Sequence, residues 1–471
     1  MSNFDAQTTP TILTADDPGW DEARRAWNLA VDQHPAAVAL PESAADVVAA
    51  VNFARERGLR VAAQGTGHNA RPLRDLGDAV LINTHAMRQV SIDPVARTAR
   101  VQAGVLWQEV ADAAAKHGLA GLAGSSPDVG VVGYTLGGGM SWLGRTYGLS
   151  ANNVAAFEAV TADGRLVRAD AGSEPDLFWA LRGGGGSFAV VTEAELRLFP
   201  VTEVYAGLLW WPAMAGARVL QAWRELTQSG LPDAFTTTAR YLNFPPIPEI
   251  PEHLRGGSFV VIDVIHLGVP AEADTLLAPL RALAPVTDTV QTIPAAALGH
   301  LHMDPEQPVP AVGDGFALAD LPAHAIDEIV RVAGPGAASP LLVVELRHVG
   351  GEMSRARPGN GALAAIAAPY TLVAGGLAPD EQAAAAAAAH VEIVKSAMSG
   401  WAARQTYLNF TESQADPARF WSPRAYDRLR RIKAAVDPAN LIRANHPVPP
   451  AGRSTGQGHT QGDTDGQSSR P

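Results

Sequence analysis

The chain has 471 residues, and its 48 acidic side chains outnumber its 36 lysines and arginines, which gives a formal net charge of −12. This balance argues against nucleic acid or an anionic membrane as the main partner. The chain has no cysteine, which excludes disulfides, thiolate metal sites, iron–sulfur clusters and cysteine nucleophiles, so any redox chemistry must use a bound organic cofactor.

The N-terminal segment, residues 1–20, is polar and acidic, so no secretory signal is visible. No uninterrupted apolar run reaches the roughly 18 residues that a membrane span requires. We therefore expect a cytoplasmic protein without a membrane partner.

Short helices and strands are predicted for the first half of the chain. Ser43 is the expected N-cap of a helix that ends at Gly58, and a buried strand over residues 59–63 follows directly. Strands of an expected second small sheet lie at residues 79–83, 90–93 and 98–103. The next predicted elements are a helix over residues 106–117, a hairpin over 157–168 with an Asp-Gly turn, a helix over 174–181 and a strand over 189–198.

The pattern changes between residues 201 and 399. Strand-like runs at residues 205–211, 235–241, 258–266 and 341–348 alternate with alanine-rich helical stretches, which predicts an antiparallel sheet with helices on one face. Proline-rich segments at 244–251 and 303–312 are expected at the surface or at a pocket rim. Residues 405–410 then predict a strand, Ser422 and Pro423 open a helix that ends before Asp437, and the polar residues after Pro450 are expected to be disordered.

Glycine recurs in three loops of the first half, at residues 61–69, 133–139 and 182–192. Repeated glycine at the ends of strands indicates backbone that closely approaches a large group, because any Cβ would fill that space. Taken alone, residues 64–69 also fit a tight turn with a surface histidine. Together, the three loops favour one extended ligand, and a dinucleotide such as FAD fits that demand.

The glycine run at residues 182–192 does not fit a nicotinamide-type nucleotide fold. It leads into a strand-like segment, whereas the dinucleotide fingerprint must open a helix and have an acidic residue about 20 positions later. A Rossmann-type site is therefore excluded by its context.

The order of these motifs resembles that of the FAD-linked oxidases of the vanillyl-alcohol oxidase superfamily, and most closely their berberine-bridge-enzyme-like branch. The resemblance rests on the glycine loop that ends in His68 and Asn69, the motifs at residues 124–139 and 176–192, and the closing patterns at 407–410 and 426–445. It covers about residues 35–449 and is weak between 201 and 399.

The resemblance implies an α+β fold, with a two-subdomain FAD-binding domain of the PCMH type and an inserted antiparallel-sheet substrate domain covered by helices on one face. The expected divisions are an N-terminal arm (1–35), the FAD-binding domain (36–200), the substrate-binding domain (201–400), a C-terminal segment that returns to the FAD domain (401–450) and a disordered tail (451–471).

The resemblance also implies that His68 is covalently bonded to a methyl carbon of the flavin ring. Many relatives form a second link from a cysteine at the position of Ser126, so this chain would carry a single link, as in the smaller nicotine-oxidising relatives. Tyr134 stands where relatives often have histidine or leucine, and its hydroxyl could still donate a hydrogen bond to the flavin.

The same resemblance places the pyrophosphate against residues 65–69, the adenine near Gly185 and Val191, and the flavin near the glycines of residues 130–139. The implied cofactor-binding residues are Gln64, Gly65, Thr66, Gly67, His68, Asn69, Ser126, Asp128, Gly130, Gly133, Tyr134, Gly137, Gly138, Gly139, Gly185, Val191, Asn409 and Asn445.

The reaction that the resemblance implies is hydride transfer from a substrate carbon to the flavin, while a base removes a proton from an attached hydroxyl or amine. Tyr407 is the first choice for this base, because the tyrosine of the Tyr-x-Asn motif faces the flavin in relatives. The alternative is a packing tyrosine whose hydroxyl caps a loop. Glu345 and Arg347 share one face of their predicted strand and His348 occupies the other, and one of these faces should look at the substrate.

His300 and His302, beside Asp304, have a His-x-His spacing that could suggest a metal site. No third ligand is evident, so no metal is predicted, and solvated loop histidines or pocket-rim residues are the preferred interpretation.

The predicted function is an FAD-dependent oxidase that acts on a small alcohol, sugar, amine or secondary metabolite, with dioxygen as acceptor and hydrogen peroxide as product. The alternatives are a flavin dehydrogenase with another acceptor, an oxidative ring-forming enzyme of a biosynthetic pathway, and a non-catalytic flavin-binding module.

Overall fold

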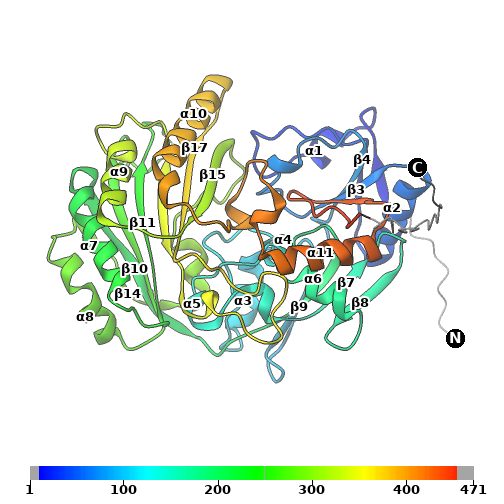
Figure 1. Cartoon of the computed structure of the whole chain (residues 1–471), viewed down its shortest axis with the longest axis horizontal. Coiled ribbons are helices and arrows are strands. Elements are labelled where there is room, and N and C mark those ends of the chain that lie inside the picture. The colour runs from blue at the N-terminus through cyan, green and yellow to red at the C-terminus, as the bar shows by residue number, and fades with distance from the viewer. Residues whose placement is uncertain (1–9, 249, 453–471) are drawn as a thin grey trace, which may run out of the picture.

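The structure is a computed structural model that describes residues 10–248 and 250–452. The predicted disorder of the tail concerns residues that lie almost entirely outside this range. The molecule has two halves (Figure 1), one built on two small sheets and the other on one large sheet. The predicted α+β class, with a large antiparallel sheet inserted between the strands of the other half, is confirmed.

The first small sheet is mainly parallel and has the strand order β1–β2–β4–β3–β18. Residues 79–83 form its central strand β4, so their assignment to the second sheet is wrong. All five residues of β4 are buried, as expected for a parallel strand between two neighbours. The strands are β1 (Thr11–Leu13), β2 (Ala37–Leu40), β3 (Arg60–Gln64), β4 (Ala79–Asn83) and β18 (Ile442–Arg443).

The second small sheet is antiparallel, with the order β5–β6–β9–β7–β8. The predicted hairpin is confirmed as β7 and β8. Helix α2 lies between the two small sheets, because its buried residues Val47 and Val51 pack with Val80 of one sheet and Val190 of the other. The strands are β5 (Val90–Asp93), β6 (Thr98–Gln102), β7 (Val154–Val160), β8 (Leu166–Asp170) and β9 (Val190–Arg197).

The helices of this half are short, and Ser43 caps α2 as predicted. The predicted helices over residues 106–117 and 174–181 are confirmed as α3 and α6. The helices are α1 (Trp20–Ala23), α2 (Ala44–Glu56), α3 (Trp107–Ala115), α4 (Val131–Leu136), α5 (Gly144–Tyr147), α6 (Pro175–Leu181) and, near the C-terminus, α11 (Pro423–Val436).

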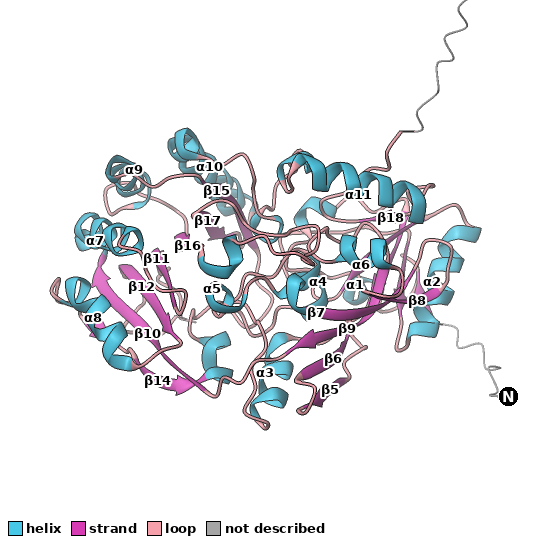
Figure 2. Cartoon of the chain, turned by 60° about the horizontal axis from the view of Figure 1, so that its bottom comes forward, coloured by secondary structure: helices cyan, strands magenta, loops and turns pink. Residues whose placement is uncertain are grey.

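The large sheet is antiparallel and has the order β13–β10–β12–β11–β16–β17–β15, with β14 also paired to β10. Helices α7 to α10 cover one face (Figure 2), as predicted, and the opposite face is turned toward the other half. The strands are β10 (Glu203–Pro212), β11 (Phe235–Asn243), β12 (Ser258–His266), β13 (Thr287–Asp288), β14 (Gln291–Pro294), β15 (Ala311–Leu318), β16 (Val343–His348) and β17 (Tyr370–Leu377). The helices are α7 (Gly216–Gln228), α8 (Pro270–Arg281), α9 (Ala323–Ala333) and α10 (Glu381–Met398).

The C-terminal segment corrects another prediction, because residues 405–410 do not form a strand. They end in the 3₁₀ helix η7 (Leu408–Phe410), which lies against β15. A Cβ at Gly315 of β15 would lie 2.7 Å from the carbonyl oxygen of Phe410. Asn69 of the other half donates through Nδ2 to the carbonyl oxygens of Leu408 and Thr411, at 3.3 Å each. The segment therefore bonds to both halves rather than to a neighbouring strand.

Among the helices of the described residues, none combines the length and the apolar composition that crossing a membrane would require.

A buried ion pair fixes α11 to the glycine-rich turn before β9. Lys433 Nζ lies 2.6 Å from Asp437 Oδ2 and donates to the carbonyl oxygens of Ser187 and Ile442, and neither side chain of the pair is exposed. Asp437 also accepts from the backbone N–H groups of Leu441 and Ile442. This pair joins the end of α11, strand β18 and the turn before β9.

We expect Lys433→Met to destabilise the fold by about 3–5 kcal/mol, because it leaves the Asp437 carboxylate buried without its cation. Urea unfolding followed by circular dichroism measures this loss. The matched control is Arg428→Met on the same helix, whose ion pair with Asp176 is exposed and whose removal should cost less than about 1 kcal/mol. Equal losses in the two variants would contradict the prediction.

Candidate functional site

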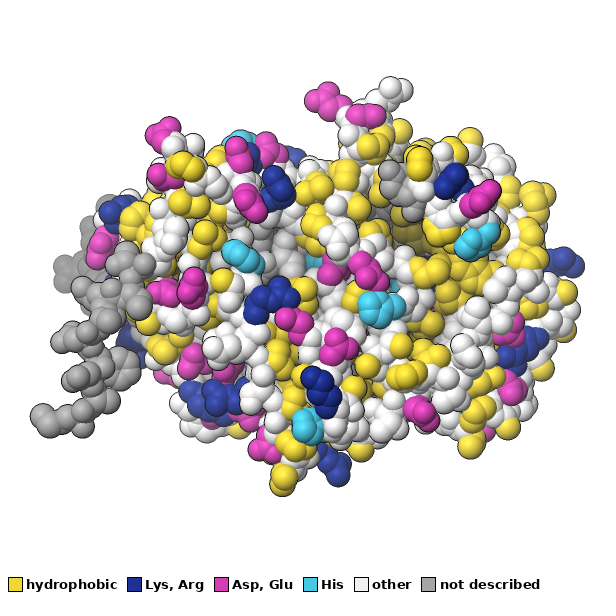
Figure 3. All heavy atoms as spheres, turned by 180° about the vertical axis from the view of Figure 1, so that it is seen from behind, with side chains coloured by type: hydrophobic (Ala, Val, Ile, Leu, Met, Phe, Trp, Pro, Cys, Tyr) yellow, Lys and Arg dark blue, Asp and Glu magenta, His cyan; other side chains and the backbone are white. Residues whose placement is uncertain are grey.

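A cavity of about 530 Å³ lies between the two halves, within the range of about 300–1,000 Å³ that small-molecule and cofactor sites occupy. Its walls come from three sources: the glycine loops of the small-sheet half, the inner face of the large sheet, and the C-terminal segment. The surface seen from behind is hollowed between the two halves, with hydrophobic side chains around the hollow (Figure 3).

The loop that follows β3 forms one end of the cavity. The backbone N–H groups of Gly65, Gly67 and His68 donate to no other described residue. Gly67 has a φ of +84°, and a Cβ there would lie 2.8 Å from the Cβ of Ala26. The loop faces Gly130, which precedes α4, with 3.4 Å between its ideal Cβ position and Thr66 Cγ2. These N–H groups can donate hydrogen bonds to the oxygens of a pyrophosphate.

Glycines from the other two loops continue the wall. A Cβ at Gly133 would meet no atom within 4 Å, so this wall stays open for a flat ring. Gly185 lines the cavity together with Val191, and Asn445 reaches it from the C-terminal segment. Asn69 also lines it, and its Oδ1 is buried without a hydrogen-bond partner among the described residues. Open glycine walls, free N–H groups and this carbonyl oxygen fit a dinucleotide.

Three of the predicted cofactor residues do not line the cavity. Gly138 and Gly139 have φ angles of +118° and +74°, and Cβ atoms there would lie 2.7 Å from Leu363 Cδ2 and 2.5 Å from Ser150 Cβ. Glycine at these two positions is therefore explained by backbone conformation and packing. Asp128 is the third, and it lies beside His68 instead.

The hydroxyl of Tyr134 is not available to a ligand, in contrast to the expectation from the sequence. It donates to the carbonyl oxygen of Leu122 at 3.0 Å, and the ring packs edge-on against Trp107 at 5.4 Å between centroids. Burial raises the pKa of Tyr134 well above its usual range. The side chain therefore supports the wall from behind.

The imidazole of His68 is held between two side chains. The ring of Trp27 stacks on it with 4.0 Å between centroids and 21° between planes. Trp27 Nε1 donates to Asp128 Oδ2 at 2.5 Å, and Asp128 Oδ1 lies 3.4 Å from His68 Nε2. His68 Nε2 is hydrogen-bonded at 3.3 Å to the backbone carbonyl oxygen of Asp128, which can only accept, so a proton on Nε2 leaves the lone pair on Nδ1. Trp27 belongs to the N-terminal arm, for which the sequence predicts no role.

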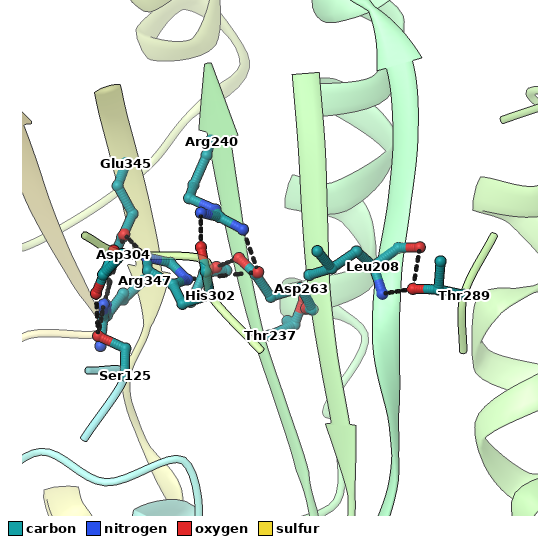
Figure 4. Close-up of polar contacts among 11 residues, drawn as sticks. Ser125, Leu208, Thr237, Arg240, Asp263, Thr289, His302, Asp304, Glu345 and Arg347 are labelled. Carbon is teal, nitrogen blue, oxygen red and sulfur yellow. Dashed lines mark hydrogen bonds and ion pairs between the residues drawn. The ribbon is translucent and has the colours of Figure 1, made fainter. Parts of the chain in front are cut away.

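The opposite wall carries a cluster of charged side chains from three strands and one loop (Figure 4). Glu345 and Arg347 of β16 face the cavity and form an ion pair, while His348 lies on the other face against Tyr370. Of the two faces of this strand, the one that carries Glu345 and Arg347 therefore lines the cavity. We call these residues the charged cluster, and its members are Arg240, Asp263, His302, Asp304, Glu345 and Arg347.

His302 is at the centre of the charged cluster. Its Nε2 lies 2.7 Å from Glu345 Oε2, and its Nδ1 lies 3.4 Å from Asp263 Oδ1. Burial acts to lower the pKa of His302, but the three carboxylates around it raise that pKa to about 9. Burial likewise acts to raise the pKa of Glu345, and the neighbouring cations of Arg347 and His302 lower it well below its usual range. His300 is not part of the cluster, since it is exposed and pairs with Glu306.

Tyr407 reaches the cavity from the C-terminal segment. Its oxygen accepts hydrogen bonds from the backbone N–H of Met140 at 2.9 Å and from Asn409 Nδ2 at 3.2 Å. Burial raises the pKa of Tyr407 far above its usual range, so the hydroxyl is protonated at neutral pH. Asn409 is placed by α4, because its Nδ2 also donates to the carbonyl oxygen of Tyr134.

Glu412 is a further cavity residue that the sequence analysis does not single out. Its Oε2 is buried without a hydrogen-bond partner among the described residues, and burial raises its pKa to about 7. The available signal is an acidic residue two positions after the Tyr-x-Asn-Phe motif. Arg240 and Asp263 are also missed, although a charge within an apolar predicted strand marks each of them.

Comparisons with known proteins agree with this geometry. A family model described as "FAD binding domain" matches residues 35–170, and one described as "Berberine and berberine like" matches residues 406–449. The first therefore includes the N–H cradle, His68 and Asp128 but not Trp27, and the second includes Tyr407 and Asn409.

Related proteins cover between about two thirds and nearly all of the chain. (R)-6-hydroxynicotine oxidase of Paenarthrobacter nicotinovorans is 27% identical over 94% of this chain and 97% of its own length. The FAD-linked oxidoreductase YvdP of Bacillus subtilis is 30% identical over 65% of this chain and 67% of its own. The solved structure of berberine bridge enzyme from Eschscholzia californica has a TM-score of 0.79 at 19% identity, covers 94% of this chain and 97% of that one, and shares the fold. The chain therefore belongs to the berberine-bridge-enzyme-like family of FAD-linked oxidases and is an FAD-dependent oxidoreductase.

Proposed function

We propose that this protein is an oxidase that removes a hydride from a carbon next to a hydroxyl or amine of a small molecule, with FAD tethered to His68. One observation carries the proposal: a single cavity joins the glycine cradle and His68 to Tyr407 and the charged cluster. FAD, when bound, would supply the two-electron acceptor for the hydride, with dioxygen as the final oxidant and hydrogen peroxide as the product.

The residues of the cradle would hold this cofactor. Gly65, Gly67 and His68 offer backbone N–H groups to the pyrophosphate, and Gly133 leaves room for the ring system. Trp27 and Asp128 hold the imidazole of His68 in one orientation, with Nδ1 as the atom that carries the lone pair. A side chain held in this way is suited to bond formation, because little freedom is lost in the step.

Removal of the proton from the substrate falls to Tyr407 in this proposal. Tyr407 can take this proton only as the phenolate, after it has lost its own proton, and the two N–H donors on its oxygen stabilise the negative charge of that form. Glu412 is the competing candidate, since a carboxyl with a pKa of about 7 suits a general base at neutral pH. The two residues predict different pH profiles.

We expect His68→Ala to bind FAD only reversibly. Wild-type protein should show flavin fluorescence at its band on a denaturing gel, and the variant should release all its flavin on denaturation. Trp27→Ala should slow covalent incorporation roughly fivefold, because it removes a stacking contact of about 1 kcal/mol. Leu29→Ala, at an exposed position two residues away, is the control. A fluorescent band from His68→Ala would rule out the proposed link.

We expect Tyr407→Phe to lower the rate of anaerobic flavin reduction by roughly 10²–10⁴-fold, the usual contribution of a positioned acid–base group. The flavin content of the variant should be unchanged. For the wild-type enzyme, release of peroxide in air during turnover distinguishes an oxidase from a dehydrogenase. Glu412→Gln is the matched variant. Glu412 is the base instead if Glu412→Gln reduces the flavin more slowly than Tyr407→Phe and if its pH–rate profile lacks an inflection near pH 7.

The charged cluster also predicts a pH dependence of stability. The pKa of His302 is raised from its ordinary 6.5 to about 9 in the folded protein, so the stabilisation is complete below pH 6.5 and is lost by about pH 9. Urea unfolding at pH 6, 7.5 and 9 should show this loss in the wild type and not in His302→Gln. The control is His300→Gln, at the exposed end of the 3₁₀ helix η4 (Ala295–His300). The prediction is wrong if the free energy of unfolding of His302→Gln falls with pH as steeply as that of the wild type.

A further inference from the structure

The cavity-facing side of the large sheet is divided into two regions of different chemistry. Arg240 and Leu242 of β11, and Phe244 directly after it, alternate with residues of the other face. This one segment therefore contributes to both regions. The charged cluster lies where the sheet meets Ser125 of the small-sheet half (Figure 4). The other region is an apolar patch, which consists of Leu208, Trp210, Leu242, Phe244, Phe259, Val261 and Val343.

The polar side chains of the charged cluster already use their hydrogen-bonding groups on one another. Arg240 donates to the carbonyl oxygen of His302 at 2.7 Å and to Asp263 at 2.5 Å. Arg347 pairs with Glu345 and donates to Ser125 at 3.0 Å. Few of these groups remain for a ligand.

Asp304 is used in the same way, because it accepts from Ser125 at 3.2 Å and from Ser126 at 2.8 Å. The guanidinium of Arg347 is also covered, with its carbon 5.0 Å from the ring centre of Trp142 and 5.1 Å from that of Phe410. Arg240 Nε and His302 Nδ1 have no hydrogen-bond partner among the described residues, but both atoms are buried. Most polar groups of the cluster are therefore used within it.

An oligosaccharide would fit such a wall poorly. Each sugar ring presents several hydroxyls, and every hydroxyl that is buried without a partner opposes binding. Apolar side chains such as Leu242 and Val343 offer no partner. A ring compound with a single polar group has only that group to satisfy, and burial of its apolar body against the patch favours binding.

We propose that the site takes a substrate with an apolar ring body and one hydroxyl or amine, and that it discriminates against oligosaccharides. The body lies on Leu242, Phe244 and Val343, and the polar group is directed toward Tyr407. This inference rests on the proposed function for the hydride step, but the choice of substrate class follows from the wall itself.

The test is an anaerobic titration of the holoenzyme with 1-phenylethanol, 2-phenylpyrrolidine, maltose and cellobiose, in which the flavin spectrum reports binding and its bleaching reports reduction. We expect at least one ring compound to bind tenfold or more tightly than either sugar. Equal or tighter binding of a sugar, or no binding of either ring compound, overturns the inference.

The same titration separates failure of the inference from failure of the proposed function. Sugar that bleaches the flavin supports an oxidase and contradicts the substrate class. Ring compounds that shift the spectrum without bleaching support the class, and if dithionite still reduces the flavin they contradict the hydride step.

Variants of the apolar patch provide a second measurement. Leu242→Asn and Phe244→Ser should each weaken binding of the ring compound by roughly tenfold or more without changing flavin content. Phe244 is only half-buried, so its variant keeps the test valid if Leu242→Asn folds poorly. Ile393→Asn, at an exposed position of α10, is the control, and unchanged affinity in both patch variants would contradict the proposal.

Discussion

The close contact between Asn409 and Gly137 positions the C-terminal side of the site. A Cβ at Gly137 would lie 1.7 Å from Asn409 Oδ1, so only glycine allows the C-terminal segment to approach the end of α4. Asn409 in turn donates to the carbonyl oxygen of Tyr134 and to the oxygen of Tyr407. Tyr407, more than 250 positions after Gly137 in the chain, is thereby fixed beside the glycine wall.

Charge balance explains how the opposite wall can be buried. The charged cluster contains three carboxylates, and with His302 protonated it contains three cations. Removing one member would leave a buried charge without compensation, so the six side chains act as a unit. Their mutual pairing gives a rigid polar end to a wall that is otherwise apolar.

The sequence predicts features that local pattern determines. Strand β12 is predicted with its observed bounds, because its nine residues are rich in β-branched side chains, and the glycine loops indicate a large ligand correctly. Features set by distant contacts are missed. The sheet to which β4 belongs depends on its partners, β15 and β17 are interrupted by glycine, and the roles of Trp27 and Glu412 appear only when remote segments meet.

Ser126 shows how one substitution connects the two halves. The family resemblance places a flavin-linked cysteine at this position in many relatives, whereas here the side chain donates to Asp304 of the large-sheet half. The same carboxylate accepts from Ser125, so two consecutive serines hold the loop that carries His302. Because His302 pairs with Glu345, this contact extends from the cofactor loop into the substrate wall. Ser125 and Ser126 therefore join the small-sheet half to the loop of the large-sheet half that carries His302.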